Sequence, residues 1–234
     1  MRISKGKYTT LFHGSKGGIV GEIKPCSRIR CDFGKGFYTG TDEYQAKSLV
    51  YNEEMPIFYE LHFDIEQIPN QKILYLNADM DWAYFVLYNR GKLEHIKNTV
   101  LYKHLALLEK QYDIIIGPIA DDNMTAAIKD FINYRITDRA FLECIKIIDY
   151  GEQVVAKTEK ACKYFSIVRE QELDNRDSVD ILKYMIGVKN KNMMSIENTR
   201  RKYLKFGKFF EESIDYYNKL LINQASNGAG VGGR

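Results

Sequence analysis

The chain has 234 residues, of which 45% are hydrophobic and 28% are charged, a balance typical of globular proteins rather than disordered ones. Its net charge of +3 is too small to argue by itself for a nucleic-acid partner. No apolar run approaches the roughly 18 residues that cross a bilayer, and no apolar stretch follows the charged N-terminus. We therefore expect a cytoplasmic protein with no membrane partner.

Hydrophobic periodicity predicts a mixed domain over the first part of the chain. In chain order we expect a strand at 8–12 that ends at His13-Gly14, a helix at 42–51 capped by Thr41, a strand at 57–63, helices at 82–89 and 99–110, a strand at 112–118, helices at 125–133 and 138–148 (the second capped by Thr137), a strand at 153–156 and a helix at 158–167. Because strands and helices do not alternate as regular βαβ units, an α+β fold is favoured over a doubly wound parallel one.

The character of the chain changes after Arg169. Residues 171–178 are polar and charged, which predicts a linker or turn, and two helices are expected at 179–188 and 196–222. The Gly-, Ala- and Asn-rich end predicts a flexible tail. We therefore divide the chain into a domain at 1–168, a helical extension at 169–222 and a tail at 223–234.

Two glycine-containing segments are candidate ligand-binding turns. Leu11-Phe-His-Gly-Ser15 places a histidine and a glycine at the end of a strand, and Phe33-Gly-Lys-Gly-Phe-Tyr38 follows about twenty residues later. Glycine lets a backbone approach a ligand closely, and aromatic faces stack on planar rings. Together the segments predict a slot for a planar ring.

Two other glycine patterns and the cysteines do not predict a site. Gly34-x-Gly36-x-x-x-Gly40 is one residue longer than the dinucleotide fingerprint and lacks a βαβ frame. Gly228-x-Gly230-x-x-Gly233 fits that spacing but lies in the expected tail with no helix after it. The four cysteines form no CxxC pair, which argues against a zinc site or a disulfide framework. We expect no bound metal ion.

Taken together, the two turn segments resemble a known superfamily. His13-Gly-Ser15 and Phe33-Gly-Lys-Gly-Phe-Tyr38 are similar to motifs of the poly(ADP-ribose) polymerases, and so of the ADP-ribosyltransferases that include diphtheria toxin. The longer stretch from Leu11 to Ala46, with residues 112–122 and 153–158, is closer still to a bacterial family of toxin-like domains of unknown function, often encoded beside an antitoxin. The resemblance spans roughly residues 8–165, and four motifs occur in the expected order.

The resemblance implies an ADP-ribosyltransferase-like split β-sheet core that binds NAD⁺ as a substrate, with flanking helices. His13 would bond the ribose of the adenosine half, and Gly14 would bond the nicotinamide carboxamide through its backbone. Tyr38 would wall the pocket, and Gln153 best fits the catalytic position of the third motif. A shift of one residue would select Glu152 instead, so the side chain that points into the cleft decides.

The residues expected to contact NAD⁺ are His13, Gly14, Ser15, Arg28, Phe33, Gly34, Gly36, Tyr38 and Tyr51, with Arg28, Lys35 or Lys16 against the pyrophosphate. The nicotinamide–ribose bond breaks through an oxocarbenium-like state, much as a glycosidic bond does. The leaving group is already cationic and needs no general acid. A side-chain oxygen near the ribose 2′-OH can stabilise the developing positive charge.

The sequence departs from the polymerases at two points. Leu49 stands eleven residues after Tyr38, where they place a second stacking tyrosine, which leaves Tyr51, Tyr44 or a single aromatic to hold the ring. Gln153 in place of Glu is unfavourable for chain elongation. We therefore expect a mono-ADP-ribosyltransferase toxin that modifies a protein or nucleic-acid acceptor and has an antitoxin as a possible partner.

Other interpretations stay open on the sequence. An NAD⁺ glycohydrolase, an RNA 2′-phosphotransferase or an inactive binding module would share the fold. Asp121-Asp122 fits a helix cap or solvated turn better than a Mg²⁺ site. The basic and aromatic residues 200–210, expected on one helix, fit a helix packed on the domain better than a grip on nucleic acid, and docking of an antitoxin is a third use.

Overall fold

The computed structural model describes residues 5–120, 122–147, 151–203 and 205–228. Within these ranges, seven strands form one sheet in the order β4-β5-β6-β2-β1-β3-β7. The strands are β1 (Thr10–Ser15), β2 (Phe37–Gly40), β3 (Ile57–Phe63), β4 (Ile73–Tyr75), β5 (Ile114–Pro118), β6 (Glu152–Ala156) and β7 (Phe165–Glu172). Among these strands only β4 and β5 pair in parallel, which confirms the α+β class.

The sheet is weakly joined at its centre. β1 pairs with β3 over its 6 residues, and β2 pairs with β6 over its 4 residues. Between β1 and β2, by contrast, the register holds a single pair, Phe12 with Gly40. The sheet therefore consists of two halves, β7-β3-β1 and β2-β6-β5-β4, with a narrow join between them.

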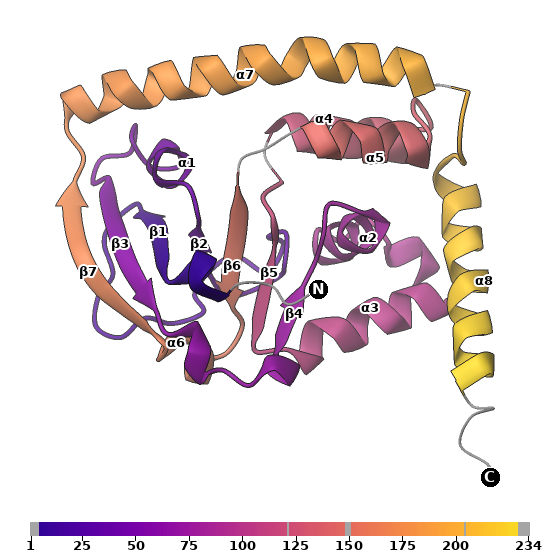
Figure 1. Cartoon of the computed structure of the whole chain (residues 1–234), viewed down its shortest axis with the longest axis horizontal. Helices are drawn as coiled ribbons and strands as arrows, with labels where there is room; N and C mark the ends of the chain where they lie inside the picture. The colour runs from indigo at the N-terminus through magenta and orange to yellow at the C-terminus, as the bar shows by residue number, and fades with distance from the viewer. Residues whose placement is uncertain (1–4, 121, 148–150, 204, 229–234) are drawn as a thin grey trace.

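Helices cover the two halves differently (Figure 1). α1 (Glu43–Ser48) packs on β1, while α2 (Met80–Asn89), α3 (Val100–Gln111), α4 (Asp122–Ile132) and α5 (Asp138–Ile147) gather beside the other half. Short 3-10 turns occur at Lys5–Tyr8, Ile65–Gln67, Asn70–Lys72 and Glu94–Ile96. The main core lies among the helices of this second half, where Trp82, Phe85, Phe131 and Phe141 are fully buried. Nearly every side chain of α2 is buried, which makes it the central helix of that core.

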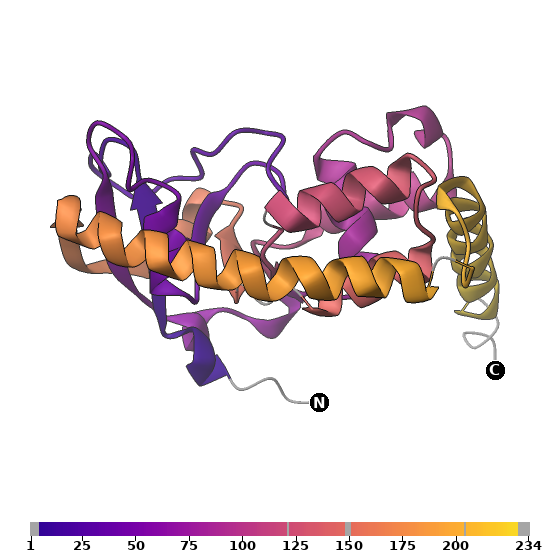
Figure 2. The same cartoon turned by 90° about the horizontal axis from the view of Figure 1, so that it is seen from above.

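Two further helices complete the C-terminal part. α7 (Asn175–Tyr203) crosses both halves of the molecule, as Figures 1 and 2 show, and α8 (Phe210–Gly228) stands at the far end beside α3. Ile181 is fully buried in the cluster around α1, and Ile196 is buried in the main core. Arg200 pairs with Asp130 of α4 at 2.8 Å. α7 is thus anchored on α1 near one end and on α4 and α5 near the other.

The prediction of a helix at 158–167 is wrong. Only Glu159–Cys162 forms a helix, α6, which Thr158 caps by accepting a hydrogen bond from the amide of Ala161 at 3.1 Å. The chain then enters β7, which pairs with β3 from Phe63 to Ile57 and makes the edge of the sheet. Most of β7 is exposed, so it lacks the buried alternation that identifies a strand from sequence.

The C-terminal expectations also need correction. The linker or turn expected at 171–178 is confined to residues 173–174, since β7 runs to Glu172 and α7 begins at Asn175. The two expected helices are divided elsewhere: α7 is continuous over 29 residues, and the break falls before Phe210, around Gly207 with its φ of +94°. Residues 200–210 therefore do not share one helix, and residues 223–228 of the expected tail are helical.

Two expected details near the site differ as well. β1 begins two residues later than expected and continues through His13, Gly14 and Ser15, because it stays paired with β3 to its end. α1 is capped by Asp42, whose carboxylate accepts from the amide of Gln45 at 2.8 Å. Thr41 instead accepts from the amide of Glu152 at 3.0 Å. Among the described helices, none is both long and apolar enough to cross a membrane.

Candidate functional site

A small pocket opens at the join between β1 and β2. Its volume is about 120 Å³, below the roughly 300–1,000 Å³ of pockets that enclose a drug-sized ligand. It can therefore enclose a ring-sized group, while a larger ligand would extend beyond it. The lining residues are Phe12, His13 and Gly14 of β1, Tyr38, Thr39 and Gly40 of β2, Gln45, Ala46 and Leu49 at α1, Ile119 after β5, and Gln153 of β6.

His13 enters the site as a neutral hydrogen-bonding group. Its Nδ1 lies 2.7 Å from the carbonyl oxygen of Tyr38, which can only accept, so Nδ1 carries the proton. Burial lowers the pKa of His13 below its ordinary value, an effect that the bond to Tyr38 partly opposes. The imidazole is therefore neutral at pH 7, and its Nε2 carries a lone pair that can accept a hydrogen bond. Its ring centroid lies 4.7 Å from that of Phe37, so the imidazole lies on the Phe37 face of the sheet, opposite the side chains of Tyr38 and Gln153.

Tyr38 walls the pocket and stabilises the preceding turn. Its hydroxyl donates to the carbonyl of Gly34 at 2.7 Å and accepts from the amide of Phe33 at 2.9 Å. Burial raises the pKa of Tyr38, so the hydroxyl keeps its proton. Because both of these bonds are internal, we assign Tyr38 the role of a positioned wall and not that of an acid or base.

Gln153, and not Glu152, faces the pocket. Neighbouring residues of a strand point to opposite faces of the sheet, and only Gln153 of this pair lines the pocket. Glu152 lies instead against the N-terminal segment, where it accepts from the hydroxyl of Tyr8 at 3.0 Å and pairs with Lys7. The alternation in β6 thus distinguishes the two candidates for the third motif.

Two residues beside Gln153 had no role in the sequence prediction. Its Nε2 donates to the carboxylate of Asp32 at 3.3 Å and to the carbonyl of Pro118 at 3.0 Å. Asp32 in turn accepts from Nε of Arg90 at 2.8 Å. Asp32 lies directly before the second glycine segment and could have been noticed there, whereas Arg90 follows α2 with no sequence signal. Both are brought to Gln153 by tertiary structure alone.

The Gly14 position is shaped by α1. A Cβ atom there would lie 2.5 Å from the backbone oxygen of Ala46 and 3.0 Å from Val50, so only glycine fits. The close approach of Gly14 to Ala46 brings α1 against β1 and closes one side of the pocket. Leu49, at the position of the polymerases' second tyrosine, lines the pocket and is 59% exposed.

The two alternative tyrosines lie elsewhere. Tyr51 packs on the cluster of Ala46, Val50 and Phe58 and does not line the pocket. Tyr44 stacks on Tyr184 of α7, with ring centroids 5.6 Å apart. Tyr38 is therefore the tyrosine that the structure places in the pocket wall.

Several residues expected to bind NAD⁺ do not line the pocket. Ser15 closes a local turn by donating to the carbonyl of Gly18 at 3.1 Å. Phe33 is fully buried in the main core, and Gly34 and Gly36 shape the turn before β2. Of the cations expected at the pyrophosphate, Arg28 and Lys35 are exposed, and Lys16 pairs with Glu53.

The acidic pair Asp121-Asp122 falls largely outside the described part of the chain. Asp121 lies outside the described residues, as does the side chain of Asp122. In the part of the chain that the structure describes, no group of three or more His, Cys, Asp or Glu side chains is placed to hold a metal ion.

Comparison with known families places the chain in one of them. The model of a family described as a protein of unknown function (DUF3990) matches residues 9–167, more than half of the chain. The chain belongs to this DUF3990 family. No curated protein and no solved structure matches it. The match contains every residue of the pocket, whereas α7 and α8 lie outside it.

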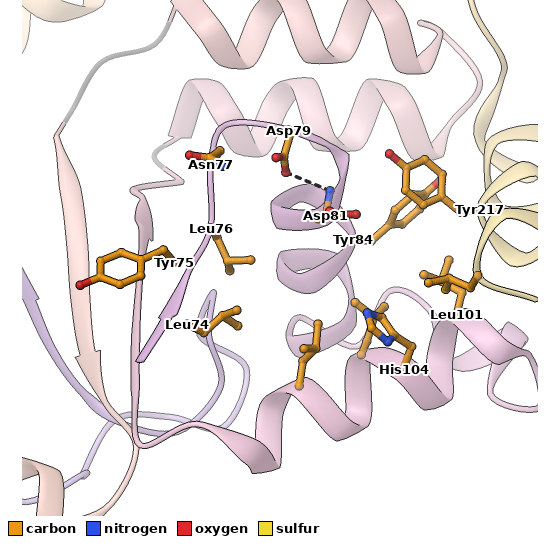
Figure 3. Close-up of a pocket in the computed structure, with 13 residues that line it drawn as sticks. Leu74, Tyr75, Leu76, Asn77, Asp79, Asp81, Tyr84, Leu101, His104 and Tyr217 are labelled. Atoms are coloured by element: carbon orange, nitrogen blue, oxygen red, sulfur yellow. Dashed lines mark hydrogen bonds between the residues drawn. The ribbon is translucent and has the colours of Figure 1, made fainter. Parts of the chain in front are cut away.

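A larger cavity of about 250 Å³ lies at the edge of the DUF3990 region, between β4, α2, α3 and α8 (Figure 3). Leucines make up much of its wall, and its polar side chains include Asp79, Asp81 and His104. Asp79 caps α2 by accepting from the amides of Asp81 and Trp82, each at 3.1 Å. Burial, and then the charge of Asp79, raises the pKa of Asp81. No residue predicted from the motifs lines this cavity, so the smaller pocket is the candidate site.

Proposed function

We propose that this DUF3990 protein binds NAD⁺ at the join of β1 and β2 and transfers a single ADP-ribose to a protein or nucleic-acid acceptor, with release of nicotinamide. The observation that carries the proposal is that Gly14, Tyr38 and Gln153 line one pocket. They come from three distant segments, and with His13 they are the residues that the resemblance to ADP-ribosyltransferases assigns to its motifs. A chance likeness of short motifs would give no reason for them to meet.

The geometry of the join supports this assignment. A sheet whose halves share one residue pair leaves backbone groups of β1 and β2 available to a ligand. The pocket volume of about 120 Å³ suits the nicotinamide ring, with Tyr38 as one wall. The adenosine half would then extend beyond the enclosed part toward the Phe37 face of the sheet, where the His13 imidazole lies, and Nε2 of His13 would accept from a ribose hydroxyl there.

Gln153 would act on the ribose that carries nicotinamide. Its two amide hydrogens are bonded to Asp32 and Pro118, so Oε1 is the atom that it can offer to a ligand. An oxygen acceptor beside the ribose 2′-OH stabilises positive charge as the nicotinamide–ribose bond breaks. The departing nicotinamide takes the bonding electron pair and becomes neutral, and the acceptor's nucleophile then bonds the same ribose carbon and gives its proton to solvent.

The proposed partners rest on the resemblance to ADP-ribosyltransferases. The acceptor is a protein or a nucleic acid, and an antitoxin protein is a further partner of this class of toxin. The fold by itself does not select among acceptors.

Nicotinamide release tests the proposal directly. The purified chain is incubated with NAD⁺ carrying a label on the adenosine half, with and without cell lysate. The test variants are His13→Ala and Gln153→Ala. The matched controls are His62→Ala, an exposed histidine on the neighbouring strand β3, and Gln111→Ala, an exposed glutamine at the end of α3.

Three outcomes separate the candidate activities. Label on a lysate component, lost in both test variants and kept in both controls, establishes a transferase. Nicotinamide release with free ADP-ribose and no labelled acceptor points to an NAD⁺ glycohydrolase instead. Binding of NAD⁺ without release under any condition overturns the enzyme proposal and leaves a binding module.

A further inference from the structure

The side-chain amide of Gln153 is fixed by two acceptors behind the pocket. Its Nε2 lies 3.3 Å from Oδ2 of Asp32 and 3.0 Å from the carbonyl oxygen of Pro118. A carboxylate and a carbonyl can only accept, so the hydrogen-bond network requires the nitrogen and not the oxygen at this point. Gln153 is only 6% exposed, which leaves its side chain little freedom to turn away.

Asp32 is itself held in place by Arg90. Nε of Arg90 donates to Oδ1 of Asp32 at 2.8 Å, and a terminal nitrogen lies 2.6 Å from the same oxygen. The guanidinium also donates to the hydroxyl of Thr125 at 3.0 Å and to the carbonyl of Ala120 at 3.2 Å. The Asp32 and Arg90 side chains are 13% and 19% exposed, so water screens this pair weakly. Asp32 therefore presents a negative oxygen to Gln153 at a fixed position.

We propose that Asp32, held by Arg90, is a positioning residue that aims the oxygen of Gln153 into the pocket and makes position 153 specific for an amide. A glutamate at 153 would bring a second carboxylate against Asp32 and a carbonyl oxygen, with no donor between them. Two carboxylates that share a site cannot both ionise without mutual repulsion. Gln153 is thus a required amide at this site and not a weakened version of a catalytic glutamate.

This inference extends the proposed function, because the ligand that receives the Gln153 oxygen is taken to be NAD⁺. The arrangement behind the pocket, however, is testable with no ligand. The neutral amide oxygen of residue 153 would accept a hydrogen bond from a ribose hydroxyl without taking its proton. The site would therefore favour target molecules whose nucleophile does not need to be deprotonated by residue 153.

A charge-swap series tests the positioning role. The variants are Gln153→Glu, Asp32→Asn and the double variant Asp32→Asn with Gln153→Glu, and Gln111→Glu is the matched control on an exposed helix end. In Gln153→Glu, the pKa of the new carboxyl group is expected to rise above its unfolded value. The folded state then loses stability as pH rises through that pKa. We expect a fall in Tm of about 4–8 °C at pH 7 that shrinks toward acid pH.

The double variant provides the decisive comparison. The side-chain amide introduced at position 32 can donate to the carboxylate introduced at position 153, so the donor and acceptor are exchanged and most of the lost Tm returns. Gln111→Glu leaves Tm unchanged. The proposal is overturned if Gln153→Glu is as stable as wild type across the pH range, or if the double variant is no more stable than that single variant.

Two further measurements separate positioning from general stability. In wild type, the side-chain N–H resonances of Gln153 should be slow to exchange with solvent, and Asp32→Asn should speed their exchange while the resonances of Gln111 do not change. Asp32→Asn should also weaken NAD⁺ binding about tenfold. If the stability and exchange results hold while wild type binds no NAD⁺, the positioning inference stands and the proposed function falls.

Discussion

Gly14→Ala tests whether α1 and β1 close the pocket as the structure shows. The added Cβ would lie 2.5 Å from the backbone oxygen of Ala46, and side-chain atoms of Val50 lie 3.0 and 3.1 Å from the same point. Real Cβ contacts are essentially never under 3.0 Å, so the helix backbone must retreat by at least about 0.5 Å. A backbone oxygen cannot avoid the new methyl group by changing rotamer, as a flexible side chain would.

The magnitude follows from that forced movement. Overpacking of this kind costs about 1–3 kcal/mol. For a chain of this size, 1 kcal/mol corresponds to about 2–4 °C in Tm, so we expect a loss of about 2–12 °C. Thermal unfolding followed by circular dichroism measures it. Retreat of α1 also moves Ala46 and Leu49 in the pocket wall, so binding of nicotinamide should weaken along with stability.

Gly17→Ala is the matched control, since nothing lies within 4 Å of a Cβ at that position. It should change Tm by no more than about 1–2 °C, since surface substitutions usually cost under about 0.5 kcal/mol. If Gly14→Ala unfolds at the same temperature as Gly17→Ala, the close approach of α1 to β1 is refuted, and so is the account of the pocket wall.

Three other predictions concern separate parts of the molecule. Tyr38→Phe leaves the amide of Phe33 without its acceptor and should lower the free energy of unfolding in urea by about 1–3 kcal/mol. An unchanged midpoint would contradict the role of Tyr38 in stabilising the turn before β2. Burial lowers the pKa of His13 below 6.5, so the unfolded chain binds the proton more readily, and stability should fall as the pH drops below about 7 toward the lower pKa of the folded state. His13→Gln should flatten this dependence, and an equally steep profile would remove His13 as its source. On α7, Ile181→Ala, at 0% exposure, should cost about 2–5 kcal/mol, whereas Ile186→Ala, at 58% exposure, should cost under about 0.5 kcal/mol; equal costs would deny the docking of α7 on α1.

The central strands were predictable because their burial follows a pattern. Residues 57–63 were expected as a strand and form β3 with the same bounds, since their alternation matches one buried face. Residues 112–118 were expected as a buried strand and contain β5, whose first four residues are all buried. The edge strand β7 escaped prediction because it is mostly exposed, and its stability comes from pairing with β3, which no local pattern records.

The site was predictable only in part. Motifs in the sequence brought out Gly14, Tyr38 and Gln153, and strand alternation then separated Gln153 from Glu152. Arg90 lies 58 positions from Asp32 along the chain, and no local sequence pattern indicates that its guanidinium bonds to that carboxylate. Residues that orient a site through tertiary contacts can be identified only from their proximity in the folded structure, so a single sequence does not indicate them.

Leu49→Tyr offers a test in which the expected change is a gain. Leu49 lines the pocket and is 59% exposed, so a larger side chain can be placed there without overpacking the core. If the pocket holds the nicotinamide ring, a tyrosine at this position can stack on the face opposite Tyr38. Such aromatic pairs contribute about 0.5–1.5 kcal/mol, which corresponds to binding tighter by about 2- to 13-fold.

Titration of the purified variants with NAD⁺ by calorimetry measures this gain. Leu107→Tyr is the control, because Leu107 is 66% exposed on α3 and does not line the pocket. Tighter binding by Leu49→Tyr alone would place the ring between positions 38 and 49. Unchanged or weaker binding, with Tm preserved, would mean that no planar ring lies beside α1. The resemblance to the polymerases would then stop at the fold of the motifs and not extend to the ligand.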